Sequence, residues 1–557
     1  MKKFLLLIFG FAFLLVSCGK EPEPEPSVPR NTFGAKFVEA HDRDLSFIKV
    51  FELEGDTYVS FSESFTVKVP ARGMTIVHGG QLSSWQDNVS HTWRVADNDT
   101  GVSITKGFPF SGSLPVYAWY SSTQFSILYS NGETMVFRVS ESEKDPDEPD
   151  NPTPGPVEPQ PYDGEKTIPV IYLTTDGGAA ITSKTTYVKG SIQIKDTTCM
   201  YSSVSYYSGA MEIRGRGNST WSKEKKPYKI KLESKAPLLG MPSDKEWALI
   251  ANYSDKSMLR NAVAMRISRQ LGFAWTPHFA WAEVYLNGEY LGLYNLFEHK
   301  EVNGHKVAID VDGGDIYLEM DKSLDEPVSF KTEKMKLPVM FKDPQNPSDS
   351  VVAELKAYLK TFEKALMDDA LRGDPKKGYE KYIDVPSFIN YFIIQEMGKN
   401  IDGKLCKSTF LTRKPGGKLV MYHVWDFDLA WGNCNYFAQY YPKLDNGPTQ
   451  FQTKDYTSNG ENTGWYYYLF QDPVWVDMVQ AKWNEMMPFF RTIPDFIDSE
   501  AKMIRPAVDR NFEKWKILGV KVWPNVVYPK TYEEEIAYLK EYYMSRLGWL
   551  DQEINKL

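Results

Sequence analysis

A proline-rich segment divides this chain and sets the first limit on its fold. Seven prolines fall between Pro146 and Pro161, with acidic residues among them. Residues 143–166 therefore have almost no apolar surface to bury, and a segment of this kind acts as a stiff spacer. The 557 residues are enough for more than one core. We expect a linker at 143–166 with separate domains on either side of it.

The chain before the linker alternates in short β-like runs. Examples are Phe47–Phe51, Phe65–Val69 and Phe125–Tyr129, and turn residues lie between such runs. This spacing predicts a small all-β domain over residues 31–142, arranged like a β-sandwich. Its aromatic residues fit a core, although similar residues in other domains bind sugars or partner proteins.

The N-terminus has the features of a signal peptide. Two lysines precede an apolar stretch, Phe4–Val16, which is too short to span a bilayer as a mature helix. The stretch ends in Leu-Val-Ser-Cys18, which resembles a bacterial lipobox, and the acidic run Lys20–Glu25 resembles an export signal of surface lipoproteins. We expect a signal peptide at 1–17, lipidation of Cys18, a tether at 18–30, and an exported lipoprotein at the outer membrane or cell surface.

After the linker, three carboxylates are expected to meet at the end of a hairpin. The runs Ser408–Lys414 and Lys418–Trp425 are β-rich, and a Pro-Gly-Gly turn separates them. Asp402 precedes the first run, and Asp426 and Asp428 follow the second. Carboxylates this close repel one another unless a cation lies between them, and such oxygens suit Mg²⁺ or Mn²⁺. The sequence therefore predicts a metal site; the alternative is a solvated turn with scattered acids.

A glycine-containing loop and a lysine-bearing strand come earlier in this part. Met211–Trp221 ends a predicted strand in the motif Arg-Gly-Arg-Gly-Asn, and Pro227–Leu232 follows as the next strand. Lys229 and Lys231 share one face of that strand because strand side chains alternate. Glycines let backbone N–H groups approach a phosphate, which a nearby lysine can also reach. Such turns beside lysines are also common on solvated strands.

The remaining pattern is mixed α+β. Further strands are expected at Ile168–Thr174, Tyr187–Ile194, Ala282–Leu286 and Tyr290–Leu296, and helices at Asp255–Leu271, Val351–Leu371 and Val385–Gly398. The C-terminal part, 481–557, is expected to be helical and to pack on the larger lobe, with one apolar face formed by Ile536, Leu539, Tyr543, Leu547, Leu550 and Ile554.

Charge and cysteine content exclude some classes of protein. The net charge is −9 and no basic stripe is present, so nucleic acid is not an expected partner. If Cys18 is lipidated, Cys199, Cys406 and Cys434 remain, which are too few for a disulfide scaffold. Cys406 and Cys434 flank the expected carboxylate site and can be bridged, although buried thiols are more common.

Five motifs in this order resemble those of the spore-coat protein kinase (CotH) family. They are Arg214–Trp221, Lys226–Lys231, Asn252–Asn261, Tyr285–Tyr294 and Trp425–Asp428. The resemblance covers about residues 165 to 480, and we set the domain at 167–480. It implies an atypical protein-kinase-like fold of two lobes that transfers the γ-phosphate of ATP, with Mg²⁺ or Mn²⁺, to Ser or Thr hydroxyls of a protein substrate.

The resemblance also implies roles for individual residues. Asp402 would be the base that orients the acceptor hydroxyl, and Asp426 would hold the metal, with Asp428 as a further ligand. Lys229 or Lys231 would hold the α- and β-phosphates of ATP. The remaining nucleotide-binding positions implied by the resemblance are Arg214, Gly215, Gly217, Asn218 and the connecting Glu298.

Three departures from a protein kinase leave a second function open. Asp402 is not preceded by His-Arg, and Ser408 stands near where an Asn would supply a second metal ligand. The helix predicted at Asp255–Leu271 has no internal acid to pair with the lysine, so Glu298 or Glu319 is the candidate partner. The alternative function is a surface binding or scaffolding lipoprotein on a kinase-like fold without transfer activity.

Overall fold

A computed structural model describes residues 168–196, 201, 206–437, 443–457, 460–461 and 464–557, and ten backbone strands between residues 35 and 141. The signal segment with Cys18, the linker 143–166 and Cys199 lie outside the described residues. The chain divides into two compact units, one built mainly from the first 148 residues and the other containing residues 149–557. Within the described part, helices that are both long and apolar enough to cross a membrane are absent.

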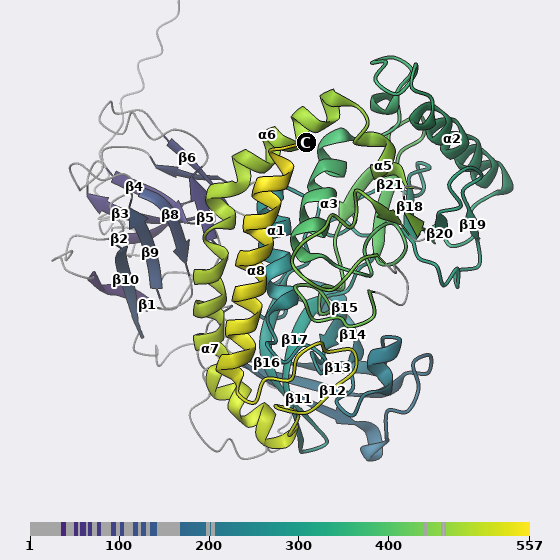
Figure 1. Cartoon of the computed structure of the whole chain (residues 1–557). Coiled ribbons are helices and arrows are strands. Elements are labelled where there is room, and N and C mark those ends of the chain that lie inside the picture. The colour runs from purple at the N-terminus through teal and green to yellow at the C-terminus, as the bar shows by residue number, and fades with distance from the viewer. Residues whose placement is uncertain are drawn as a thin grey trace, which may run out of the picture. The chain divides into compact units, whose positions relative to one another are not determined.

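The first unit contains only strands among its described residues (Figure 1). They form one ten-stranded sheet in the order β1-β10-β9-β8-β5-β6-β7-β4-β3-β2, in which every pairing is antiparallel. Their bounds are β1 Ala35–Ala40, β2 Lys49–Leu53, β3 Asp56–Ser62, β4 Phe65–Val69, β5 Thr75–His78, β6 His91–Val95, β7 Gly101–Ile104, β8 Pro115–Tyr120, β9 Gln124–Tyr129 and β10 Thr134–Glu141. The sandwich arrangement stays a prediction.

The second unit begins with a closed barrel of seven strands, in the order β11-β12-β13-β14-β15-β17-β16. Their bounds are β11 Val170–Thr175, β12 Val188–Lys195, β13 Tyr206–Gly215, β14 Tyr228–Ala236, β15 Asp244–Ile250, β16 Phe279–Leu286 and β17 Glu289–Glu298. Alternating apolar residues such as Ile213, Ile230 and Leu249 fill its interior. The predicted strands are confirmed, but their closure is a new finding: β11 pairs in parallel with β16, which joins the first strand to the last hairpin.

A second sheet carries the predicted hairpin. Its five strands run in the order β19-β20-β18-β21-β22. Their bounds are β18 Ile316–Met320, β19 Ser329–Lys331, β20 Pro338–Asp343, β21 Thr409–Arg413 and β22 Val420–His423. The β21–β22 pair is antiparallel, which confirms the hairpin. A two-stranded sheet, β23 Tyr456–Thr457 and β24 Gly460–Glu461, lies later in the chain.

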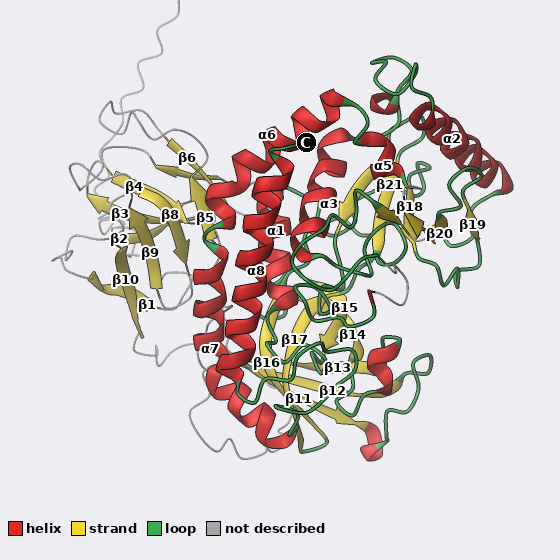
Figure 2. Cartoon of the chain, viewed as in Figure 1, coloured by secondary structure: helices red, strands yellow, loops and turns green. Residues whose placement is uncertain are grey.

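Helices, joined by loops, form the rest of the described part of this unit (Figure 2). They are α1 Arg260–Leu271, α2 Asp349–Met367, α3 Val385–Gly398, α5 Trp465–Leu469, α6 Pro473–Phe490, α7 Ile493–Lys514 and α8 Tyr532–Ile554, with short 3₁₀ turns at Asp176–Gly178, Ser219–Ser222 and Tyr379–Lys381. The bounds of α3 agree with the prediction. Helix α1 begins five residues later than predicted, because Met258 has a non-helical φ of 65°. The Asp255 carboxylate, which precedes the helix, accepts a hydrogen bond from the backbone N–H of Arg260 at its start.

Helix α8 packs lengthwise against α7 and also contacts α3 and α6 (Figure 1). A capping box between Thr531 and Glu534 starts it. The six apolar residues predicted to form one face are all buried. The helix is therefore held by its apolar stripe, as the spacing predicts.

One acid on this helix is buried and gives a pH-dependent prediction. Burial raises the pKa of Glu535 to about 7, with Arg260 and Lys256 opposing the shift and Asp255 adding to it. The folded chain thus binds a proton more tightly than the unfolded chain, so stability falls as pH rises from about 4.5 through 7. We expect Glu535→Gln to unfold with a free energy about 2–3 kcal/mol higher than wild type at pH 8, with no difference near pH 4.

Urea unfolding at several pH values measures this difference. Glu541→Gln, at an exposed position of the same helix, is the control and should match wild type throughout. A stability difference for Glu535→Gln that does not change with pH would contradict the assignment.

Candidate functional site

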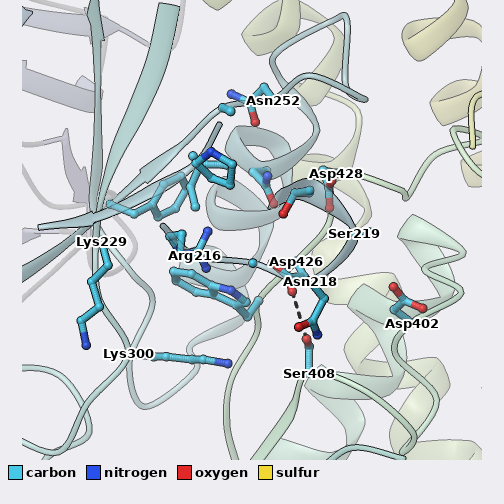
Figure 3. Close-up of a pocket in the computed structure, with 18 of the residues that line it drawn as sticks. Arg216, Asn218, Ser219, Lys229, Asn252, Lys300, Asp402, Ser408, Asp426 and Asp428 are labelled. Carbon is cyan, nitrogen blue, oxygen red and sulfur yellow. Dashed lines mark hydrogen bonds between the residues drawn. The ribbon is translucent and has the colours of Figure 1, made fainter. Parts of the chain in front are cut away.

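One cavity of about 500 Å³ lies where the barrel, α1 and the hairpin ends meet. Its lining includes the loop between β13 and β14, the ends of β15 and β17, and the segments around Asp402 and Asp426. Figure 3 shows Lys229, Lys300 and Arg216 toward one side of the cavity and Asp402 and Asp428 toward the other. Positive and negative side chains thus line one pocket, and some of them pair with each other, as Lys407 does with Asp402 and Lys300 does with Glu319.

The hairpin brings three carboxylates to the cavity, as its geometry predicts. Asp402, Asp426 and Asp428 all line it. The Ser408 hydroxyl donates a hydrogen bond to Asp426 Oδ2 at 3.2 Å, and the Asn400 side-chain amide donates to the Asp426 carbonyl at 3.2 Å. These contacts fix Asp426, whose φ of 59° turns the chain sharply after the strand.

The pKa of Asp428 reflects the crowding of these negative charges. Burial raises its pKa to about 8, and the negative charges of Asp426, Asp255 and Asp402 add to the shift. A carboxyl group that resists ionisation in this way is stabilised as an anion by any cation placed among the acids. The donor set of oxygen atoms suits Mg²⁺ or Mn²⁺.

Helix α1 holds the segment that carries Asp426 and Asp428. The Asn261 side-chain carbonyl accepts a hydrogen bond from the Phe427 backbone N–H at 2.9 Å, and Arg260 Nε donates to the Ala430 carbonyl at 3.0 Å. Arg260 is itself paired with Asp255 at 2.7 Å, and both side chains are fully buried. The Asn252–Asn261 motif thus positions the carboxylate segment from the barrel side.

Among the cationic side chains that line the cavity are Lys229, Arg216 and Lys300. Lys229 Nζ lies 2.5 Å from Glu246 Oε2, on the neighbouring strand β15. Burial lowers the pKa of Arg216, an effect that the charges of Asp426 and Asp428 oppose. Lys300 Nζ lies 3.5 Å from Glu319 Oε1. These cations can neutralise a polyanion that enters the cavity.

The glycine loop approaches the same cavity. Gly217 has a φ of 81°, and a Cβ atom there would fall 2.1 Å from Thr220 Oγ1, so a larger residue would strain this turn and force Thr220 to move. Its carbonyl accepts a hydrogen bond from Lys184 Nζ at 3.0 Å. A Cβ atom at Gly215 would fall 2.5 Å from the Trp221 ring, which gives this glycine a packing role.

The structure brings most of the predicted site residues together. Those that line the cavity are Asp402, Asp426, Asp428, Lys229, Arg214, Gly217 and Asn218. Gly215, Lys231 and Glu298 are not part of the lining. Lys231 is exposed further along β14, so of the two lysines only Lys229 faces the cavity.

The prediction that Glu298 or Glu319 pairs with the cavity lysine, Lys229, is wrong. Glu298 is buried and contacts His278, from which it accepts a backbone hydrogen bond at 2.9 Å, and Glu319 pairs with Lys300 and Lys342. The partner of Lys229 is Glu246 instead. In the β14–β15 ladder Glu246 stands opposite Lys231, two positions along from Lys229, and it reaches the buried lysine diagonally.

Several cavity residues were missed from sequence. Arg216 lies inside the Gly-Arg-Gly motif, so that motif could have indicated it. Asn252 is the first residue of the Asn252–Asn261 motif, which could have indicated it in the same way. Lys300, His299 and Lys407 carry no local signal, since each reaches the cavity only through the tertiary fold.

The two described cysteines near the site are not bridged. Cys406 and Cys434 are both buried, and neither forms a disulfide. Cys406 Sγ contacts the Gly403 carbonyl at 3.2 Å. The buried-thiol alternative is therefore the one that the structure supports.

A comparison with known protein families gives the following match. The model of a family described as CotH kinase protein matches residues 213–550. The matched range begins in β13, ends in α8, and contains the three carboxylates and the three cations described above. A search of curated proteins finds no match.

Proposed function

The chain belongs to the CotH kinase family, since the family's model matches residues 213–550 of 557, and from this premise we propose that it is an atypical Ser/Thr protein kinase anchored to a membrane by lipid. The observation that supports this most is that three carboxylates and several cationic side chains line one cavity. Phosphate transfer between ATP and a hydroxyl depends mainly on positioning and on neutralising charge.

The residues present fit a nucleotide with a divalent metal. Asp426 and Asp428 would hold Mg²⁺ or Mn²⁺, which when bound neutralises charge on the phosphates. Lys229 and Arg216 would hold phosphate oxygens, and the loop at Gly217 and Asn218 would cover them.

Asp402 has the role of base in this proposal. It lines the cavity beyond Asp426 and carries a side chain that is 20% exposed, so an acceptor hydroxyl can reach it from solvent. Its carboxylate would accept the hydroxyl proton as the oxygen attacks the γ-phosphorus, while the bond from that phosphorus to the β-phosphate oxygen breaks.

A transfer assay on the full-length chain tests this function. ATP labelled in its γ-phosphate is incubated with the chain and with dephosphorylated casein, in Mg²⁺, in Mn²⁺ or in excess EDTA. We expect incorporation into protein with either metal and none with EDTA, because the carboxylates need a cation between them and the phosphates. Absence of incorporation with both metals would favour the scaffolding lipoprotein instead.

The proposed location rests on the N-terminal motif. Lipidation of Cys18 would place the mature protein in the membrane fraction, because attached acyl chains bury many methylene groups. Cys18→Ala should appear in the soluble fraction when cells are fractionated, with Cys199→Ala as the control that stays with membranes. A Cys18→Ala protein that remains in the membrane fraction would contradict the lipid anchor.

A further inference from the structure

The carboxylate of Asp402 is contacted at one oxygen by two donors. Lys407 Nζ lies 3.4 Å from Oδ1, and the Tyr436 hydroxyl donates a hydrogen bond to the same Oδ1 at 3.4 Å. Neither of these contacts uses Oδ2. Because a carboxylate turns about its last single bond, two donors on one oxygen fix which oxygen faces away from them.

Tyr436 reaches Asp402 from outside the cavity. Asp402 and Lys407 are among the side chains that line the cavity, and Tyr436 is not. The phenol therefore does not stand where a nucleotide would lie. Its position suits support of the base rather than contact with the reacting phosphate.

Tyr436 is itself held by the segment between α7 and α8. Its ring stacks on Trp523, with centroids 5.7 Å apart and planes 17° from parallel. The backbone N–H of the preceding Asn435 donates to the Pro524 carbonyl at 3.0 Å. Stacking and this backbone hydrogen bond both restrict where the phenol can lie.

The same segment also contacts the loop between β13 and β14. Lys223 Nζ donates to the Trp523 carbonyl at 2.6 Å and lies 5.3 Å from the centre of the Trp523 ring. A continuous set of contacts therefore runs from the glycine loop through Trp523 and Tyr436 to Asp402.

We propose that Tyr436 is a positioning residue for Asp402: its hydroxyl, held by Trp523, fixes the carboxylate so that Oδ2 faces the acceptor hydroxyl. The inference rests on the proposed kinase function. Lys407 alone holds the carboxylate less well, because its flexible side chain is 35% exposed. The phenol has fewer rotatable bonds than the lysine side chain, and its ring stacks on Trp523.

The test compares Tyr436→Phe with wild type in the full-length chain. This change removes one hydroxyl and keeps the ring that stacks on Trp523. Initial rates of casein phosphorylation, measured at varied ATP and casein, should show kcat lowered about tenfold with both KM values unchanged, as expected when a hydrogen bond that orients the base is lost. Trp523→Phe should stay near wild type, and Trp523→Ala should show part of the loss.

Tyr538→Phe is the matched control. Its hydroxyl donates to the Gly432 carbonyl at 2.9 Å, so the variant also loses one phenolic hydrogen bond but no contact with Asp402. We expect its kcat to match that of wild type. An equal loss in Tyr538→Phe would overturn the specific role of Tyr436.

The outcomes separate this inference from the kinase proposal. If wild type transfers phosphate and Tyr436→Phe has the same kcat, the positioning role is wrong and the kinase function stands. Weaker binding of Mg²⁺–ATP by Tyr436→Phe would indicate a general structural defect and would contradict the inference. Transfer of the labelled phosphate to Tyr436 itself would also contradict it, because the residue would then be an acceptor. If wild type transfers no phosphate under any condition, both proposals fail.

Discussion

Asp402→Asn is expected to lower kcat for phosphate transfer by about 10²-fold or more, while Mg²⁺–ATP binding stays close to that of wild type. An asparagine keeps the shape of the side chain but cannot take up the proton of the acceptor hydroxyl. Asp402 contacts Lys407 and Tyr436 and lies beside the other carboxylates without sharing a hydrogen bond with Asp426. Its loss should therefore affect the transition state more than nucleotide binding.

Single-turnover transfer and equilibrium ATP binding, measured on the same preparation, separate the two effects. Asp445→Asn is a suitable control, because Asp445 also pairs with a lysine, Lys399 at 3.4 Å, but stands outside the cavity lining. It should transfer phosphate at the wild-type rate. An Asp402→Asn protein with wild-type kcat would exclude Asp402 as the base.

Arg546→Met is expected to destabilise the chain by about 3–5 kcal/mol. Arg546 in α8 pairs with Glu396 in α3 at 2.6 Å, and both side chains are fully buried. Burial raises the pKa of Glu396, and Arg546 opposes that shift together with the backbone N–H groups of residues 452–454. Without the arginine, a buried carboxylate would keep three backbone donors but lose its counter-charge.

The measurement is the denaturant midpoint of the full-length chain, followed by tryptophan fluorescence. Arg505→Met gives the contrast, since Arg505 pairs with Asp509 and Glu533 at exposed positions and should change stability by no more than about 1 kcal/mol. The double variant Glu396→Gln with Arg546→Met should recover part of the loss. Equal effects of Arg546→Met and Arg505→Met would contradict the role of the buried pair.

Local patterns predicted those features of the fold that neighbouring residues determine. The Pro-Gly-Gly turn between two β-rich runs was enough to place β21 and β22, and thereby to bring Asp402, Asp426 and Asp428 to one cavity. The apolar spacing of α8 predicted its buried face in the same way. Such features depend on turn chemistry and on periodicity, both of which can be read within a short window.

Features that depend on partners distant in sequence were not predictable. The parallel pairing of β11 with β16 closes the barrel, yet nothing in either strand indicates its neighbour. Glu246 was not recognised as the partner of Lys229 because the pairing depends on the β14–β15 register. Glu298 was chosen by position in the chain, whereas its burial against His278 takes it out of the cavity.

The most direct test of the central claim is equilibrium binding of ATP to the full-length chain, titrated calorimetrically with and without Mg²⁺. Lys229→Met and Asp426→Asn should each weaken Mg²⁺-dependent binding by about tenfold or more, because each removes a charge from one wall of the cavity. Lys231→Met, which changes the exposed lysine of the same strand, should bind as wild type does. The account predicts that wild type binds ATP only with the metal present. It also predicts that only the two cavity variants lose this binding. Absence of ATP binding by wild type, or an equal loss in Lys231→Met, would contradict the assignment of this cavity as a nucleotide site.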